Sequence, residues 1–113
     1  MATMINHVWV EQTLQVTEAQ RDSADILVET EDGVWWRGSF VTIEFLQRQM
    51  YLSREIGKDI RNMAPVPFIA LETPHIIVEN LLQDTIEDTI DNLMTLGIFE
   101  NVFSVYEEYI ERT

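Results

Sequence analysis

The residue types that proteins use to bind metals come closest together in the stretch Glu72-Thr73-Pro74-His75. A Glu-x-x-His spacing is used in carboxylate-bridged metal sites, where one helix presents both side chains, and Glu79 follows His75 by four residues. Pro74 and the β-branched residues after it disfavour a helix, and the chain has no second Glu-x-x-His to complete a dinuclear site. We therefore predict no metal and no cofactor here, and we expect His75 to be an edge residue that hydrogen-bonds locally.

Nucleophilic and phosphate-binding chemistry has no contiguous motif in this chain. None of the serines lies in a nucleophile-elbow context, and Ser39 is more simply a helix cap. The 4 glycines are scattered, so they form no phosphate-binding loop. The chain has no cysteine, which excludes disulfides, thiol catalysis and thiolate metal sites. We predict that the protein is not an enzyme and assign no catalytic residues.

Charge is distributed unevenly along the chain, which has 20 acidic and 7 basic residues and a net charge of −13. Five of the basic residues fall between positions 37 and 61, namely Arg37, Arg48, Arg54, Lys58 and Arg61. A surface this acidic repels nucleic acids and anionic membranes, and it suits a basic protein partner. The apolar runs are too short to span a bilayer and no secretory signal precedes them, so we expect a cytoplasmic protein.

The aromatic stretch Trp35-Trp36-Arg37 is the first candidate for binding a partner. Adjacent residues of a strand point to opposite faces, so one tryptophan enters the core and the other lies on the second face. That second ring is either covered by another part of the fold or exposed beside Arg37 as an interaction patch, which Trp9 could join. Self-association is the commonest use of such a patch.

A row of carboxylates on a predicted helix is the second candidate, formed by Asp84, Glu87, Asp88 and Asp91. Their spacing places them on one helical face. This face is either simply solvated or presented to a cationic partner, and a third use is pairing with the basic stripe of Arg54, Lys58 and Arg61 in a second subunit. We predict that Glu87, Asp88 and Asp91 bind a partner.

The elements that position these residues follow from periodicity and turn signals. Alternating apolar residues predict a strand over 8–16, and Asp32-Gly33 predicts a hairpin between strands at about 25–30 and 34–40. A helix capped by Ser39 or Thr42 should run to about residue 62, with close packing at Gly57.

The second half of the chain contains one well-marked helix. The apolar residues of 68–71 and 76–78 form either one bent strand or two. Asp84 and Glu87 suggest a capping box for a helix over about 85–96, which Gly97 should end, and 102–110 favours a last strand over a terminal helix.

These expectations combine into one domain over residues 1–113 with an α+β fold. The predicted order is β-β-β-α-β-α-β, a small mixed or antiparallel sheet with two helices on one face. The leading functional interpretation is a non-enzymatic, acidic binding or assembly domain that forms a homodimer, in its sharpest form an inhibitor or immunity-type protein that neutralises a basic partner. The alternative is a small enzyme or ligand-binding protein with a pocket that uses Glu72, His75 and Arg37.

Overall fold

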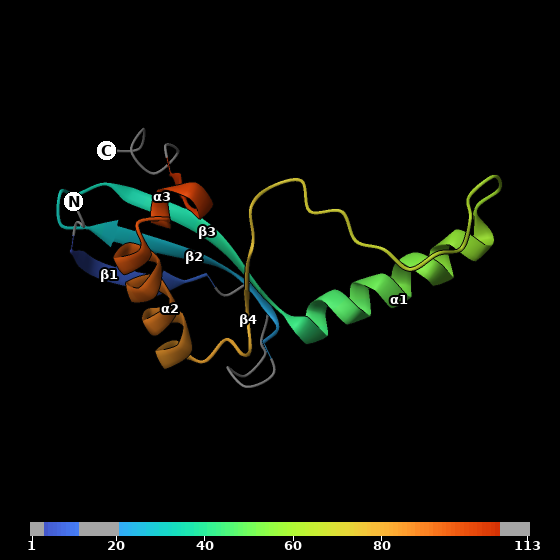
Figure 1. The fold of residues 1–113 in the computed structure, drawn as a ribbon, viewed down its shortest axis with the longest axis horizontal. Helices are drawn as coiled ribbons and strands as arrows, with labels where there is room; N and C mark the ends of the chain where they lie inside the picture. Colours follow the sequence, from blue (N-terminus) through green and yellow to red (C-terminus); the bar gives the residue numbers. More distant parts are fainter. Residues whose placement is uncertain (1–3, 12–20, 107–113) are drawn as a thin grey trace.

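A mixed sheet of five strands forms the centre of the computed structural model, which describes residues 4–11 and 21–106. The strands are β1 Ile5–Val10, β2 Ser23–Thr30, β3 Trp35–Thr42, β4 Ile76–Val78 and β5 Ser104–Val105. β1, β2 and β3 are antiparallel neighbours, β4 runs parallel to β3, and β5 pairs with β3 in the antiparallel sense (Figure 1). The predicted α+β class with a mixed sheet is confirmed. Residues 12–16 of the first predicted strand lie outside the described residues.

The hairpin between β2 and β3 is closed by the predicted Asp-Gly turn. Gly33 has a φ of 83°, a conformation that costs glycine nothing because it has no Cβ. The Asp32 carboxylate accepts hydrogen bonds from the Thr30 hydroxyl at 2.5 Å and from the Val34 amide at 3.2 Å. These two bonds lower the pKa of Asp32, since they stabilise its charged form. The turn therefore fixes the register that places Leu27 opposite Arg37.

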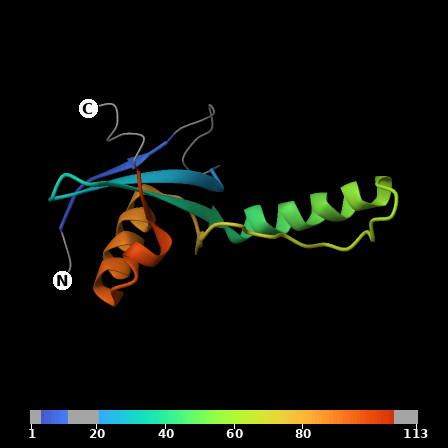
Figure 2. The same ribbon diagram turned by 90° about the horizontal axis from the view of Figure 1, so that it is seen from above.

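The core lies on one side of the sheet, beneath the helices α2 (Gln83–Leu96) and α3 (Phe99–Val102). Alternate residues of β2 and β3 point into it, so Ile26, Val28 and Phe40 are fully buried. Figure 2 shows both helices on this side of the sheet. The stacked rings of Phe99 and Phe103, 4.4 Å apart at their centroids, connect α3 to this core.

The helix α1 (Ile43–Asp59) does not pack on the sheet. It begins directly after β3 and projects beyond the end of the sheet, away from α2 and α3 (Figures 1 and 2). The radius of gyration is 16.4 Å, whereas a compact chain of this length has about 13 Å. The expectation of two helices on one face is therefore met by α2 and not by α1, because no loop residue separates β3 from α1 and allows the chain to turn back.

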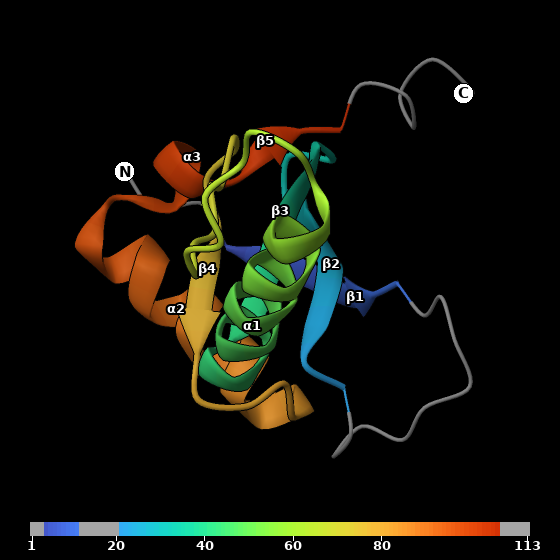
Figure 3. The same ribbon diagram turned by 90° about the vertical axis from the view of Figure 1, so that its right-hand side faces the viewer.

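Residues 60–75 return along α1 without regular secondary structure, as Figure 3 shows. The predicted strand over 68–71 is absent and only β4, at 76–78, joins the sheet. Pro65 and Pro67, just before this segment, lack the amide hydrogens that a strand requires, so the backbone around them is irregular. Gly57 is buried, and a Cβ there would lie 3.1 Å from the Cα of Pro65, so the predicted close packing at this glycine is confirmed.

The N-terminus of α2 differs from the prediction, whereas its C-terminus agrees with it. The capping box was wrong, because Leu82 is the N-cap and Asp84 lies inside the first turn. No side chain caps the first turn, and Asn80 instead fixes the chain just before it, since its Oδ1 accepts hydrogen bonds from the Leu82 amide and the Thr85 hydroxyl. At the other end Gly97 is left-handed and donates to Met94, as predicted for a Schellman ending.

The last predicted strand is much shorter than expected. Residue 102 belongs to α3, β5 contains only Ser104 and Val105, and residues 107–110 lie outside the described residues. Among the helices of the described ranges, none is long and apolar enough to cross a bilayer.

The junction between β3 and α1 depends on Thr42, which gives a first prediction. The buried Thr42 hydroxyl accepts from the Phe45 amide at 3.2 Å and donates to the Asp22 carbonyl at 3.3 Å. Thr42→Val keeps the shape and removes both bonds, so the free energy of unfolding should fall by about 1–2 kcal/mol. Urea unfolding at one fixed protein concentration measures this. Thr42→Ser is the control, because it keeps the hydroxyl; a loss in Thr42→Ser with none in Thr42→Val would mean that the methyl group, not the cap, stabilises the junction.

Candidate functional site

The face of the sheet opposite α2 presents the tryptophan patch that the sequence suggested. Trp9 is 60% exposed and its ring centroid lies 6.3 Å from that of Trp35, on a neighbouring part of the same face. Trp36 points the other way and packs edge-on against Phe99, with centroids 5.4 Å apart. The predicted division of the two adjacent tryptophans between core and second face is confirmed. Among the described helices, none covers the face that carries Trp9 and Trp35.

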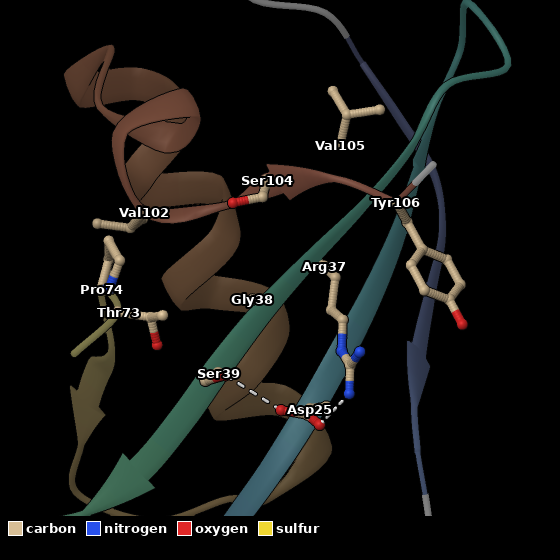
Figure 4. A pocket seen from close by; sticks show the side chains of 10 residues that line it. All are labelled: Asp25, Arg37, Gly38, Ser39, Thr73, Pro74, Val102, Ser104, Val105 and Tyr106. Carbon is tan, nitrogen blue, oxygen red and sulfur yellow. Dashed lines mark hydrogen bonds and ion pairs between the residues drawn. The ribbon is translucent and has the colours of Figure 1, made fainter. Parts of the chain in front are cut away.

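Arg37 lies on this open face within a small polar network, shown in Figure 4. Its guanidinium donates to Asp25 at 2.5 Å and lies 5.8 Å from the ring of Tyr106. The hydrogen bond to Asp25 raises the pKa of Arg37. Ser39 donates to the other oxygen of Asp25 at 3.1 Å. The Asp25 carboxylate therefore orients both Arg37 and Ser39, which lie two positions apart on the same face of β3.

A hollow of about 470 Å³ borders this network, where the edge of β3 is left unpaired between β5 and β4. β5 pairs with β3 as far as Arg37 and β4 from Phe40 onward, so Gly38 and Ser39 lie between the two ladders. Gly38 is required there because a Cβ would lie 2.6 Å from the Phe103 ring. Thr73, Ser104 and Tyr106 also line the hollow (Figure 4), which makes it suitable for a small polar ligand.

The residues of the possible metal or ligand site lie apart in the structure. His75 lies beside a smaller hollow of about 190 Å³, and its Nδ1 is 2.8 Å from the Thr73 carbonyl oxygen, which is the local hydrogen bond expected for it. Arg37 lines the larger hollow, whereas Glu72 is exposed and lines neither of the two. Within residues 4–11 and 21–106, no three His, Asp or Glu side chains gather closely enough to hold a metal ion.

The acidic row of α2 is exposed along its whole length. Asp84, Glu87, Asp88 and Asp91 all face solvent, and Glu87 accepts a hydrogen bond from Gln83 at 2.8 Å. The ion pairs found among the described residues lie elsewhere, on the sheet and on α1. Because α2 covers the core face, its carboxylates lie on the opposite side of the sheet from Trp35 and Arg37. The predicted binding residues thus form two separate surfaces, and Trp36 belongs to neither.

A third surface was missed by the sequence analysis. We call residues 43–75, which comprise α1 and the returning segment, the arm. None of the buried apolar residues of the core belongs to the arm, yet it contains most of the large apolar side chains that are exposed in the described chain. These are Ile43, Met50, Tyr51, Leu52, Ile56, Ile60, Val66, Phe68 and Leu71. The breadth of the apolar pattern on α1, wider than one stripe, was the available signal.

The arm contains an apolar hollow of about 400 Å³ between α1 and the returning segment. From α1 it is lined by Gln49, Leu52, Ser53 and Ile56, and from the returning segment by Met63, Phe68, Ile69 and Ala70. The spacing of the four α1 residues is i, i+3, i+4 and i+7, so they share one face of the helix. Leu52 and Ile56 present apolar side chains on this face, beside the polar side chains of Gln49 and Ser53.

The arm also differs from the rest of the chain in charge. It carries as many basic as acidic residues, so the net charge of −13 belongs entirely to the remainder, which we call the body. The basic residues are Arg48, Arg54, Lys58 and Arg61, and the acidic ones are Glu44, Glu55, Asp59 and Glu72.

Comparison of the chain with protein-family models, curated proteins and solved structures found no match.

The division of the tryptophans between two faces gives a second prediction. Trp36→Ala removes a ring packed against the core and should lower the free energy of unfolding by about 3–5 kcal/mol. Trp9→Ala removes an exposed ring and its contact with Trp35, so the loss should be about 1 kcal/mol. Chemical unfolding followed by circular dichroism compares the two. Equal losses would show that the face carrying Trp9 is covered in solution.

Proposed function

We propose that this protein is a non-enzymatic binding and assembly domain that forms a homodimer and presents an acidic surface to a basic protein partner. The observation that carries the proposal is the arm. It extends from the body, has no buried apolar residue of its own and exposes a row of large apolar side chains. Such a surface on a small protein is typical of a contact with another polypeptide.

The charge distribution supports the second half of the proposal. The exposed carboxylates of α2 lie about 5–6 Å apart along the helix, as side chains three or four positions apart do. The body has few basic residues to neutralise them, so their potential adds over the surface. A basic protein would be steered toward this surface and would associate faster at low salt. An inhibitor or immunity-type protein is the sharpest form of this proposal.

The hollow beside Arg37 supports a second candidate, a small-ligand binding protein. Its volume of about 470 Å³ falls in the range of small-molecule sites, and it has several hydroxyl groups along its wall. The Arg37 charge is already paired with Asp25, and Ser39 donates to the same carboxylate. These groups therefore satisfy one another without a ligand, so we rank this candidate second.

Assembly gives a third prediction. Light scattering at micromolar concentration should give twice the chain mass of 13.2 kDa, because the exposed apolar surface of the arm becomes buried on association. The mass should persist in about 0.5 M salt, since salt screens ion pairs but not apolar contacts. A mass of 13.2 kDa at both salt concentrations would contradict the proposed dimer.

The acidic helix gives a fourth prediction. The triple substitution Glu87→Gln, Asp88→Asn and Asp91→Asn should leave the fold intact, because like charges at i, i+4 slightly oppose a helix. Asp84 is kept, since a carboxylate in the first turn stabilises the helix dipole. With a basic partner captured from lysate, the association rate at low salt should fall markedly, and the difference should shrink as salt increases.

The control for this experiment changes the net charge by the same amount at other exposed positions, namely Glu31→Gln, Glu79→Gln and Glu100→Gln. Equal rates for the two triple variants would mean that only the total charge matters, and equal rates for the first variant and the unmodified protein would reduce α2 to a solvated face.

A further inference from the structure

We propose that two copies of this chain associate through their arms, with the apolar faces of the two α1 helices together across a two-fold axis. This rests on the proposed function and names the surface that serves it. Three surfaces are candidates for self-association: the open sheet face with Trp9 and Trp35, the acidic face of α2, and the arm.

The apolar content of the arm is the first argument. Leu52 and Ile56 are 42% and 54% exposed, and Phe68, which lines the same hollow, is 46% exposed. These side chains lie on the two elements that run along each other for the length of the helix, about 25 Å for its 17 residues. The open sheet face is smaller in apolar content, because Asp25, Glu29 and Arg37 lie among its tryptophans.

Charge is the second argument, and it decides between a contact of arms and a contact of bodies. Two bodies that carry the whole net charge of −13 repel each other when they approach. The arm is neutral, so two arms meet without this cost. Because the arm projects from the body, as Figure 2 shows, an antiparallel pair of arms leaves the two bodies at opposite ends. Electrostatics therefore favours contact through the arms.

Symmetry is the third argument. In a two-fold dimer the same patch of both subunits forms the interface. Each charged residue near the axis therefore meets a residue of that same patch in the other copy. Arg48 and Glu55 lie on either side of Leu52 along α1. When two helices cross antiparallel near Leu52, Arg48 of one copy comes next to Glu55 of the other, and opposite charges lie at both ends of the apolar contact. Within its own chain Arg48 also pairs with Asp22, and Glu55 with Lys58.

The basic stripe offers a different arrangement, in which Arg54 and Lys58 of one copy contact the α2 carboxylates of the other. These basic residues lie on the side of α1 away from the hollow, in a row with Gln47 and Tyr51. The two arrangements therefore use opposite faces of one helix, which makes them distinguishable.

Single-cysteine cross-linking tests the proposal cleanly, because the chain has no cysteine of its own. Cysteine is introduced singly at Gln49, Leu52, Ser53 and Ile56 on the hollow face and, as matched controls on the same helix, at Gln47, Tyr51, Arg54 and Lys58. Each protein is oxidised with oxidised glutathione at micromolar concentration and analysed by non-reducing electrophoresis. Two residues form a disulfide only when their Cα atoms come within about 7 Å, so only positions near the axis should give a covalent dimer.

We expect at least one hollow-face position to give a covalent dimer in most of the protein, at least about tenfold more than any of the control positions. Leu52→Glu should in addition convert the light-scattering mass from dimer to monomer, while Tyr51→Glu on the other face should not. The folded state of each variant is checked by the near-ultraviolet signal of the tryptophans, all of which lie in the body.

The outcomes separate this inference from the proposed function. A dimeric mass with cross-links only at the control positions, or only when a cysteine on α1 is mixed with one at Asp88, would overturn the pairing of arms and favour contact with α2. A dimeric mass with no cross-link at any α1 position would place the interface on another surface and also overturn it. A monomeric mass for the unmodified chain would overturn both proposals.

Discussion

The direct passage of β3 into α1 at Thr42 is the constraint on which the shape of this protein depends. Thr42 is paired with Val78 in the sheet and is also the N-cap of the helix. Its amide and hydroxyl both bond the Asp22 carbonyl, and Arg48 on the first turns of α1 pairs with the Asp22 side chain. The helix thus begins while the chain is still held in the sheet. Its axis is fixed by the direction of the strand, so it leaves the body instead of folding over it.

This constraint divides the molecule into parts with different physical properties. The body closes its core with α2 and α3 alone, and the stacked rings of Phe99 and Phe103 belong to that core. The arm is left with contacts along a single line, where Gly57 allows the backbone at Pro65 to approach closely. One line of contact buries little apolar surface, and a segment that buries so little is expected to gain stability from a second polypeptide.

Local signals predicted most of the elements, whereas the position of α1 required information that they do not contain. The Asp32-Gly33 turn, the Thr42 cap and the Gly97 ending depend on residues within one turn of the chain, and all three are present. The strand over 68–71 was wrong because apolar residues alone do not supply a pairing partner. The capping role given to Asp84 was wrong because the helix begins at Gln83, two residues before the predicted start, and Asp84 lies inside its first turn.

The candidate surfaces were predictable to a similar extent. Because side chains alternate along a strand, the sequence separated Trp35 from Trp36. Because side chains three or four positions apart share a helical face, it also placed Glu87, Asp88 and Asp91 together. Both predictions use only the geometry of a single element. The arm was not predictable in this way. The breadth of its apolar pattern was a signal, but the pattern also fits an ordinary core-facing helix, and the direct passage of β3 into α1 after Thr42 is what takes the helix away from the core.

The separation of charge from apolar surface also bears on how far assembly can proceed. An exposed apolar arm on a neutral body would contact many surfaces and risk open-ended association. Here each body carries the full net negative charge, while the arm carries none. Contacts between bodies are penalised by this charge. In the proposed dimer, the charge of the bodies opposes further contacts and the acidic faces of α2 stay directed outward.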